Sequence, residues 1–171
     1  DSEAIKRNFS VILNDDRSVR RVIEKPRKVP NRLKGCGLYL FDDRIFEAVR
    51  RTPRTAMRDE YELTDSIQIL IDYEYPVQVA EVVQWDINLT FIGDLIRCCT
   101  HELEKSGRTS IVGENCTIAE GVELHNTVIG NNVRIENPIQ LTDCVVLDLA
   151  VVSSTSPISR AVISADSILT E

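Results

Sequence analysis

The sequence has no long hydrophobic run and no leader-like start. No apolar stretch reaches the roughly 18 residues that a membrane-spanning helix needs. The N-terminal stretch, residues 1–6, lacks the basic-then-apolar pattern of a secretory signal peptide, and the chain does not begin with methionine. We therefore predict no membrane segment, and the missing methionine suggests a fragment or a processed chain.

Cysteines are few and show no spacing that would hold a metal or a disulfide framework. The chain has five, Cys36, Cys98, Cys99, Cys116 and Cys144. An odd number without a Cys-x-x-Cys pair argues against a disulfide scaffold and against a zinc site. A reduced, cytoplasmic setting fits this pattern best.

Aromatic residues are also scarce, and the positive charge is confined to one part of the chain. Aromatics make up 5% of the residues, and none follows residue 108. Residues 1–58 hold 15 basic and 8 acidic side chains, whereas the net charge of the whole chain is −7. The basic residues gather around residues 20–34, where no aromatics stand between them to stack on bases. Nucleic-acid binding is disfavoured, and a phosphate site or a solvated basic loop remain the alternatives.

Hydrophobic patterning in the first hundred residues predicts alternating strands and helices. A hairpin is expected from strands at Phe9–Leu13 and Val19–Glu24, joined by turn residues at 14–17. A buried strand is expected over Cys36–Phe41 and a β-rich stretch over Val77–Val83. One helix should follow Asp42 or Asp43 and share Ile45, Phe46 and Val49 on a face. Further helices are expected after Thr64 or Asp65 and over Phe91–Glu104, ending at Gly107. This alternation predicts an α/β layer structure.

After residue 108 aliphatic residues recur with a fixed period of 17. The columns are Val112, Ile129, Val146 and Ile163; Ile118, Ile135, Val152 and Leu169; and Leu124, Leu141 and Ile158. Three short flat faces joined by tight corners produce this pattern, and stacked coils bury a continuous core. Gly113, Gly121 and Gly130 are expected at corners that need unusual backbone angles. The segment resembles the hexapeptide-repeat left-handed parallel β-helix, and its handedness comes only from that resemblance.

Five short motifs carry a second resemblance along residues 1–100. They are Asn8-Phe9-Ser10-Val11, Ile23-Glu24-Lys25-Pro26, Gly37-Leu38-Tyr39-Leu40-Phe41, Glu62-Leu63-Thr64-Asp65, and Trp85-Asp86-Ile87 with Asp94-Leu95. In this order and spacing they resemble the C-terminal half of a sugar-1-phosphate nucleotidyltransferase. The implied fold is the C-terminal part of a Rossmann-like nucleotidyltransferase domain (1–100), a linker (101–108) and the β-helix (109–171).

The resemblance implies a reaction and a site. A hexose-1-phosphate oxygen would attack the α-phosphorus of a nucleoside triphosphate, giving an NDP-sugar and pyrophosphate, chemistry that depends on positioning and charge neutralisation. Lys25 would be catalytic and hold the sugar phosphate, and Glu24 would accept hydrogen bonds from sugar hydroxyls. Gly37 and Tyr39 would shape the sugar pocket. Asp86 would help to hold Mg²⁺, the implied cofactor.

The chain departs from the family pattern at three places. Gly35 stands where the family has Asn, Trp85 is adjacent to Asp86 rather than two residues before it, and the stretch from Asp86 to Leu95 is two residues longer. The Gly-rich nucleotide loop of the family has no counterpart in this sequence. We therefore expect this chain to carry only the sugar-phosphate half of the site and to need an N-terminal catalytic half as partner.

Each assignment has a structural alternative. Glu24 and Lys25 are also compatible with a surface ion pair, Tyr39 with a core aromatic, and Asp86 with a helix cap. Two other functions remain open: a non-catalytic regulatory or assembly subunit of the same fold, and a hexapeptide-repeat acyltransferase using His125 as base. The open faces of a β-helix favour a homo-oligomer.

Overall fold

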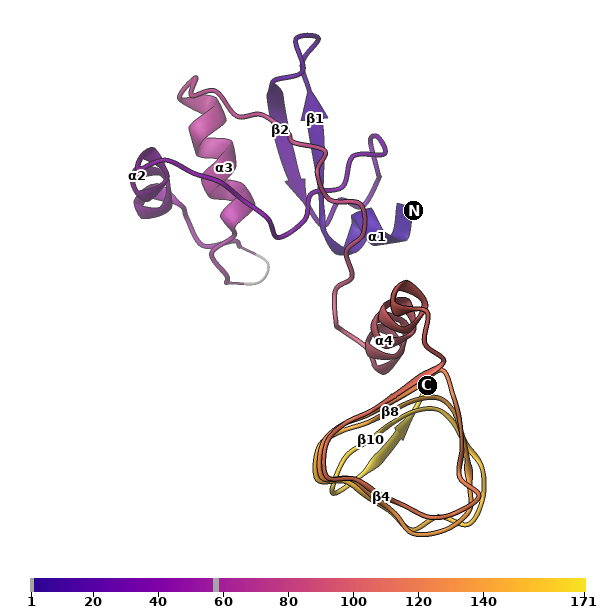
Figure 1. Ribbon diagram of the computed structural model, residues 1–171. Helices are drawn as coiled ribbons and strands as arrows, with labels where there is room; N and C mark the ends of the chain where they lie inside the picture. Colours follow the sequence, from indigo (N-terminus) through magenta and orange to yellow (C-terminus); the bar gives the residue numbers. More distant parts are fainter. Residues whose placement is uncertain (1, 57–58) are drawn as a thin grey trace. The chain divides into compact units, whose positions relative to one another are not determined.

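The computed structural model describes residues 2–56 and 59–171 and divides the chain into two compact units. The first is Asp1–Asp86 and the second Ile87–Glu171. Each unit has its own hydrophobic core, so each is described by itself (Figure 1). No helix in the described residues combines the length and apolar character needed to cross a membrane.

The first unit is built on the predicted hairpin. It begins with α1 (Ser2–Arg7), followed by β1 (Phe9–Leu13) and β2 (Val19–Glu24), which pair antiparallel. The turn forms as its residue types predict: Asp16 accepts hydrogen bonds from the backbone and the hydroxyl of Ser18 at 2.9 and 2.6 Å. Phe9, Val11 and Val19 form the buried side of this hairpin.

Two helices complete the first unit, α2 (Arg44–Arg51) and α3 (Leu63–Asp72). In Figure 1 the elements of this unit follow the order α2, α3, β2, β1. Helix α2 contacts α3, and α3 contacts β2. Asp42 accepts a hydrogen bond from the Arg44 backbone, as expected of a residue at a helix start. The predicted apolar face of α2 is wrong in part, because Ile45 and Ala48 are buried whereas Phe46 and Val49 are exposed.

The predicted cap of α3 is also wrong. The N-cap position is Glu62, so Thr64 and Asp65 lie inside the first turn. A serine or threonine signal marks a helix start only to within a residue or two, because the first turn accepts the same residue types. This displacement leaves the Thr64 hydroxyl available for another partner.

Two of the predicted strands do not form. Residues 36–41 form no strand, and residues 37–41 are exposed, with Leu40 at 99%. The segment before residue 36 pairs with β1 through the Ser10–Lys34 bridge and the bond from the Gly35 N–H to the Phe9 carbonyl, and this pairing goes no further within the described part of the chain. A strand needs a neighbouring strand to bind its backbone groups, so residues 36–41 do not form one. Among the residues that the structure describes, the stretch 77–83 likewise makes one bridge, between Gln78 and Ser18.

The second unit begins with the predicted helix, α4 (Ile92–Ser106). Gly107 ends it in the left-handed conformation, φ 67°, as expected. Its start is capped by Asp94, whose carboxylate accepts hydrogen bonds from the backbone N–H groups of Thr90 and Phe91. Asp94 therefore caps this helix, and the alternative that Asp86 does so is wrong.

The rest of the second unit is a parallel β-helix, consistent with the left-handed hexapeptide coil. Seen nearly end-on, its coils trace a triangle (Figure 1). Its strands are β3 (Ser110–Val112), β4 (Thr117–Ile118), β5 (Glu123–His125), β6 (Thr127–Ile129), β7 (Arg134–Ile135), β8 (Gln140–Val146), β9 (Val151–Val152), β10 (Ile158–Ile163) and β11 (Ile168–Thr170). The 17-residue period is confirmed, because every parallel pairing in these coils joins residues 17 positions apart.

The repeat ends earlier than the sequence pattern predicts. Leu169 was expected to continue the column of Ile118, Ile135 and Val152. Instead β11 runs antiparallel to β10, Leu169 pairs with Val162, and its side chain is half exposed. The fourth member of that column is therefore wrong, since the chain reverses before a further coil is completed.

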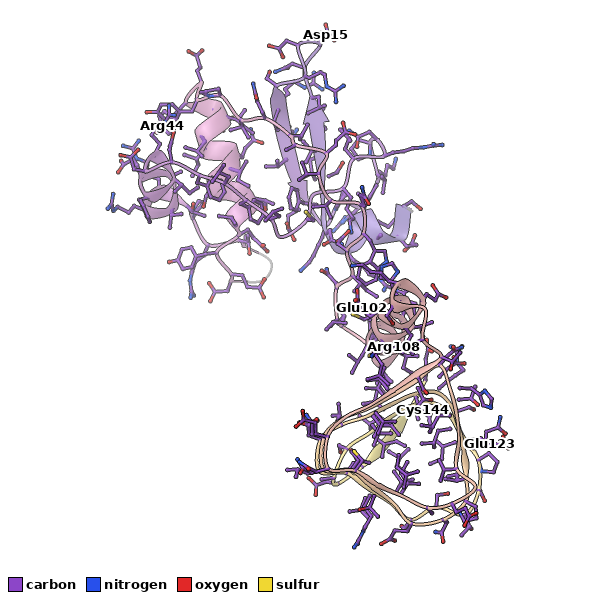
Figure 2. All side chains as sticks on the ribbon, in the orientation of Figure 1. Asp15, Arg44, Glu102, Arg108, Glu123 and Cys144 are labelled. Atoms are coloured by element: carbon purple, nitrogen blue, oxygen red, sulfur yellow. The ribbon has the colours of Figure 1, made fainter. Side chains whose placement is uncertain are left out.

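Side chains of the repeat fill the inside of the triangle, as Figure 2 shows. The buried cluster includes Ile135, Leu141, Cys144 and Val152. On one outer face Val145 and Val162 are covered by α4 through Ile96. The helix α4 thus packs within the second unit. The predicted end of the nucleotidyltransferase domain at residue 100 stays a prediction.

Two of the corner glycines are needed for a reason other than the predicted one. Gly121 has φ 85°, as expected for an unusual corner angle. At Gly113 and Gly130 the angle is ordinary, and a Cβ would lie 2.5 Å from the Gly130 carbonyl oxygen and 2.2 Å from the Asp148 carboxylate, respectively. These two glycines allow consecutive coils to approach closely.

Candidate functional site

Glu24 and Lys25 lie where β2 ends, and the backbone turns sharply between them and the following loop. Glu24 is the last paired residue of the hairpin, opposite Phe9. The Lys25 N–H donates to the Asn8 carbonyl at 2.7 Å, and Lys25 has φ 41°, in the left-handed region. Such backbone angles cost roughly 1–2 kcal/mol in a residue with a side chain and are common at functional sites. Pro26 is buried, so the turn presents Lys25 to solvent.

The carboxylate of Glu24 is held by the first turn of α3. The Thr64 hydroxyl, in a residue only 4% exposed, donates to Glu24 Oε2 at 3.2 Å. The same helix accepts a hydrogen bond from the Val22 N–H through Gln68 Oε1 at 3.1 Å. Residues four apart on a helix and two apart on a strand each share a face, so the two bonds fix α3 along β2.

Tyr39 lies close to Glu24 within an aromatic stack. Its ring stacks on Phe9 and Phe41, with centroid distances of 6.2 and 5.6 Å. Burial raises the pKa of the Tyr39 phenol above its usual value, and the negative charges of Glu24 and Cys36 raise it further. Glu24 pairs with Phe9 across the hairpin and Tyr39 stacks on Phe9, so both residues share this neighbour. Their roles as two sides of a sugar pocket stay predictions.

The two glycines of this segment have different surroundings. A Cβ on Gly35 would overlap the Phe9 ring at 1.9 Å, so Gly35 is needed for packing. A Cβ on Gly37 would meet nothing within 4 Å, and Gly37 is exposed. Open space next to Gly37 is compatible with a ligand there, and its role in the sugar pocket stays a prediction.

Asn31 fastens the basic loop after Pro26 to the hairpin. Its amide donates to the Val11 carbonyl at 2.6 Å, and its Oδ1 accepts from the Leu33 N–H at 2.9 Å. Within the described residues, a group of basic side chains on β2 and this loop makes no ion pair with any acidic side chain: Arg20, Arg21, Lys25, Arg27, Lys28 and Arg32. Unneutralised positive charge of this kind attracts phosphate.

Asp86 is engaged by a lysine. Lys34 Nζ lies 2.6 and 2.5 Å from the two carboxylate oxygens, and both side chains are less than one-third exposed. Among residues 2–56 and 59–171, no three His, Cys, Asp or Glu side chains cluster as metal ligands. A single carboxylate already bound to an ammonium does not by itself make a magnesium site, so the metal role of Asp86 stays a prediction and no step below uses it.

His125 lies apart from these residues, on β5 of the second unit. Its Nε2 is 3.8 Å from Glu123 Oε2, and both side chains are more than half exposed. Figure 2 shows Glu123 on the outside of the triangular coil. A loose, exposed pair of this kind does not favour His125 as a catalytic base.

Comparisons with known proteins agree with both resemblances. A family model described as "GlmU-like, C-terminal hexapeptide" matches residues 98–171. "Bifunctional protein GlmU" of Methanocaldococcus jannaschii is 40% identical over 68 residues, which are 39% of this chain and 16% of that protein. "Glucose-1-phosphate thymidylyltransferase" of Streptomyces griseus is 30% identical over 165 residues, which are 83% of this chain and 46% of that protein.

The chain is related to the sugar-1-phosphate nucleotidyltransferases. A second "Bifunctional protein GlmU", from Methanococcus aeolicus, is 32% identical over 134 residues, 77% of this chain and 28% of that protein. The matches to the thymidylyltransferase and to this second protein extend beyond the hexapeptide segment, so both units share in the relationship. In each case the chain spans less than half of the relative's length.

The sequence motifs named residues of the candidate site but not the contacts that support them. Glu24, Lys25 and Tyr39 were named from motifs, and the negative charge of Glu24 contributes to the raised pKa of Tyr39. Thr64 and Lys34 were missed as partners of Glu24 and Asp86. The signal for Thr64 was its motif, which was interpreted as a helix cap only. The roles of all these residues toward a substrate stay predictions.

Proposed function

We propose that this chain carries the sugar-phosphate half of a nucleotidyltransferase site. The complete reaction would join a nucleoside triphosphate and a hexose-1-phosphate to give an NDP-sugar and pyrophosphate, with the nucleotide held by protein outside this sequence. The observation that supports it best is the position of Glu24 at the end of β2: it pairs with Phe9, on which Tyr39 stacks, and the exposed Lys25 follows it in the chain. One relative is named as acting on glucose 1-phosphate, which makes that sugar phosphate the first probe.

In this site each side chain has one task. The Lys25 ammonium would pair with the sugar phosphate, and the unpaired basic residues of the loop would raise its local concentration. The Glu24 carboxylate, held by Thr64, would accept hydrogen bonds from sugar hydroxyls. The Tyr39 ring would give the sugar an apolar wall beside the open space at Gly37. The residues thus bind and orient the sugar phosphate for attack.

Magnesium belongs to the proposal only as an expectation. Mg²⁺ would neutralise the phosphates when bound, and Asp86 would supply one carboxylate once Lys34 released it. Homo-oligomer formation is likewise proposed from the open faces of the β-helix. Neither is used in the test below.

Calorimetric titration of the chain with glucose 1-phosphate tests the proposal. Binding is expected, and Lys25→Ala should weaken it by about 10- to 100-fold because charged hydrogen bonds contribute roughly 1.5–3 kcal/mol. Lys105→Ala, an exposed lysine near the end of α4, is the matched control and should bind normally. Equal binding by the Lys25 and Lys105 variants would contradict the role of Lys25. No heat with any hexose-1-phosphate would favour the non-catalytic alternative.

A further inference from the structure

The contact between α3 and β2 places a buried hydroxyl against the candidate site. Thr64 is almost fully buried, yet its hydroxyl is turned to the one acidic residue of the site, at 3.2 Å from Glu24 Oε2. A buried hydroxyl needs a hydrogen-bond partner, and for Thr64 the Glu24 carboxylate is that partner.

The position of Thr64 on the helix adds to this effect. It stands in the first turn of α3, where backbone N–H groups without partners give the helix end a partial positive charge. Gln68, one turn later, binds the Val22 N–H and so prevents α3 from sliding along the strand. Both bonds act on the same strand, two residues apart.

We propose that Thr64 is a positioning residue, which fixes the Glu24 carboxylate in the orientation needed to accept hydrogen bonds from the sugar hydroxyls. This inference rests on the proposed function for its sugar, but the fixing of Glu24 is a property of the free protein. Discrimination between sugar phosphate and bare phosphate then depends on α3 through its bond to Glu24. Selectivity for the sugar, rather than affinity for phosphate, is the quantity that Thr64 controls.

Three variants distinguish an effect of Thr64 on the orientation of Glu24 from an effect on the stability of the fold. Thr64→Val removes the hydroxyl at nearly constant shape, and Thr64→Ser retains it. Thr52→Val is the matched control, because Thr52 is also buried, and its hydroxyl bonds the hydroxyl of Ser66 on α3 at 2.6 Å without touching Glu24. Thermal unfolding of all three shows what each change costs in stability.

The first measurement needs no ligand. Residue-resolved tyrosine NMR follows the titration of Tyr39, whose pKa is raised by burial and by the charge of Glu24. Glu24→Gln should lower this pKa, and Thr64→Val should lower it part of the way, because the Glu24 carboxylate loses one of the bonds that orient it. Thr64→Ser and Thr52→Val should leave it unchanged. An unchanged Tyr39 titration in Thr64→Val would overturn the inference.

The second measurement compares glucose 1-phosphate with inorganic phosphate in calorimetry. Thr64→Val should weaken sugar-phosphate binding by about 5- to 10-fold and leave phosphate binding unchanged, and Thr64→Ser should restore it. Equal losses for both ligands, or the same loss in Thr52→Val, would overturn the inference, since either indicates a general structural defect. If the unsubstituted chain binds no sugar phosphate, the proposed function fails, and the Tyr39 titration still decides whether Thr64 fixes Glu24.

Discussion

Residues with left-handed backbone angles mark both the candidate site and the corners of the β-helix. Lys25 has φ 41° at the end of β2. In the coils the same angles recur every 17 residues, at Asn115, Asn132 and Leu149 with φ 55°, 56° and 66°. Asparagine adopts this region at lower cost than other side chains, but leucine does not. Leu149 is therefore strained where its two counterparts are not.

Replacing Leu149 by asparagine should stabilise the β-helix. The leucine side chain is 66% exposed, so little apolar burial is lost, and relief of the backbone strain should raise the free energy of unfolding by about 0.5–1 kcal/mol. Urea unfolding of Leu149→Asn measures this difference. The reverse substitution, Asn132→Leu, should destabilise the unit by a similar amount. A destabilised Leu149→Asn variant would show that the leucine side chain contributes contacts that outweigh the strain.

The turn between β1 and β2 should respond to acid through one residue. Hydrogen bonds from the hydroxyl and backbone of Ser18 hold the pKa of Asp16 below its usual value of 3.8. A lowered pKa in the folded state adds stability above the unfolded value, and this stability is lost as the pH falls through the folded value. Asp16→Ala should therefore be less stable than the unsubstituted chain at pH 7.

The pH series that tests this uses urea unfolding between pH 7 and pH 2. The difference between Asp16→Ala and the unsubstituted chain should shrink below about pH 4, where the carboxyl of the unfolded chain becomes protonated. Asp15→Ala is the control, since Asp15 lies beside it in the same turn without these bonds. A difference that persists unchanged at pH 2 would mean that Asp16 acts through something other than its charge.

At the scale of elements, the sequence best predicted the helices and strands that are stabilised by local or repeated contacts. The hairpin of β1 and β2 and the helix α4 with Gly107 depend on residues near in sequence, and both form as predicted. The coils repeat the same parallel strand pairing every 17 residues, so the sequence pattern is recognisable even where one position departs from it. Residues 36–41 needed a neighbouring strand that hydrophobic patterning does not reveal, and there the prediction was wrong.

The same contrast holds within the candidate site. Glu24, Lys25 and Tyr39 were recognisable because each belongs to a short motif, whereas the bond from Thr64 to Glu24 joins residues 40 positions apart. Such a contact depends on how α3 docks on β2, and that docking is decided by side-chain packing. Lys34 and Asp86 are 52 positions apart and were missed for the same reason.

Hydrogen bonds from buried or partly buried side chains link consecutive coils. The Thr127 hydroxyl donates to the Leu141 carbonyl at 3.1 Å, and the thiols of Cys116 and Cys144 make the equivalent bonds to Gly130 and Ile158, each 14 residues ahead. The thiols are weak donors, so Thr127, which is fully buried, should contribute most.

Thr127→Val tests these hydrogen bonds. Loss of the hydroxyl leaves the buried carbonyl without this donor and should lower the free energy of unfolding by about 1–2 kcal/mol. Thr127→Ser should lose far less, because it keeps the hydroxyl. Both are measured by urea unfolding followed by circular dichroism. If the valine variant is as stable as the serine variant, packing rather than hydrogen bonding stabilises these coils.

At the scale of the whole molecule, the two units have separate cores, and this should appear in unfolding. The first unit is held by clusters around Phe9 and Ile45, and the second by the coil interior and by α4 packed on the β-helix. Ile96 lies on α4, is 7% exposed, and packs against Val145 and Val162 of the β-helix. Ile96 therefore stabilises the second unit without belonging to the core of the first.

Substituting Ile96 by alanine should affect only one of two transitions. Truncating a buried isoleucine costs about 2–5 kcal/mol, and that loss should lower the stability of the β-helix unit alone. Hydrogen exchange measured by mass spectrometry resolves the two units, with faster exchange expected over residues 92–171 and unchanged exchange in β1 and β2. Ile45→Ala is the matched variant and should show the reverse pattern. Faster exchange in both units after either substitution would show that the chain unfolds as one cooperative body, and the sugar-phosphate site would then depend on the β-helix for its stability.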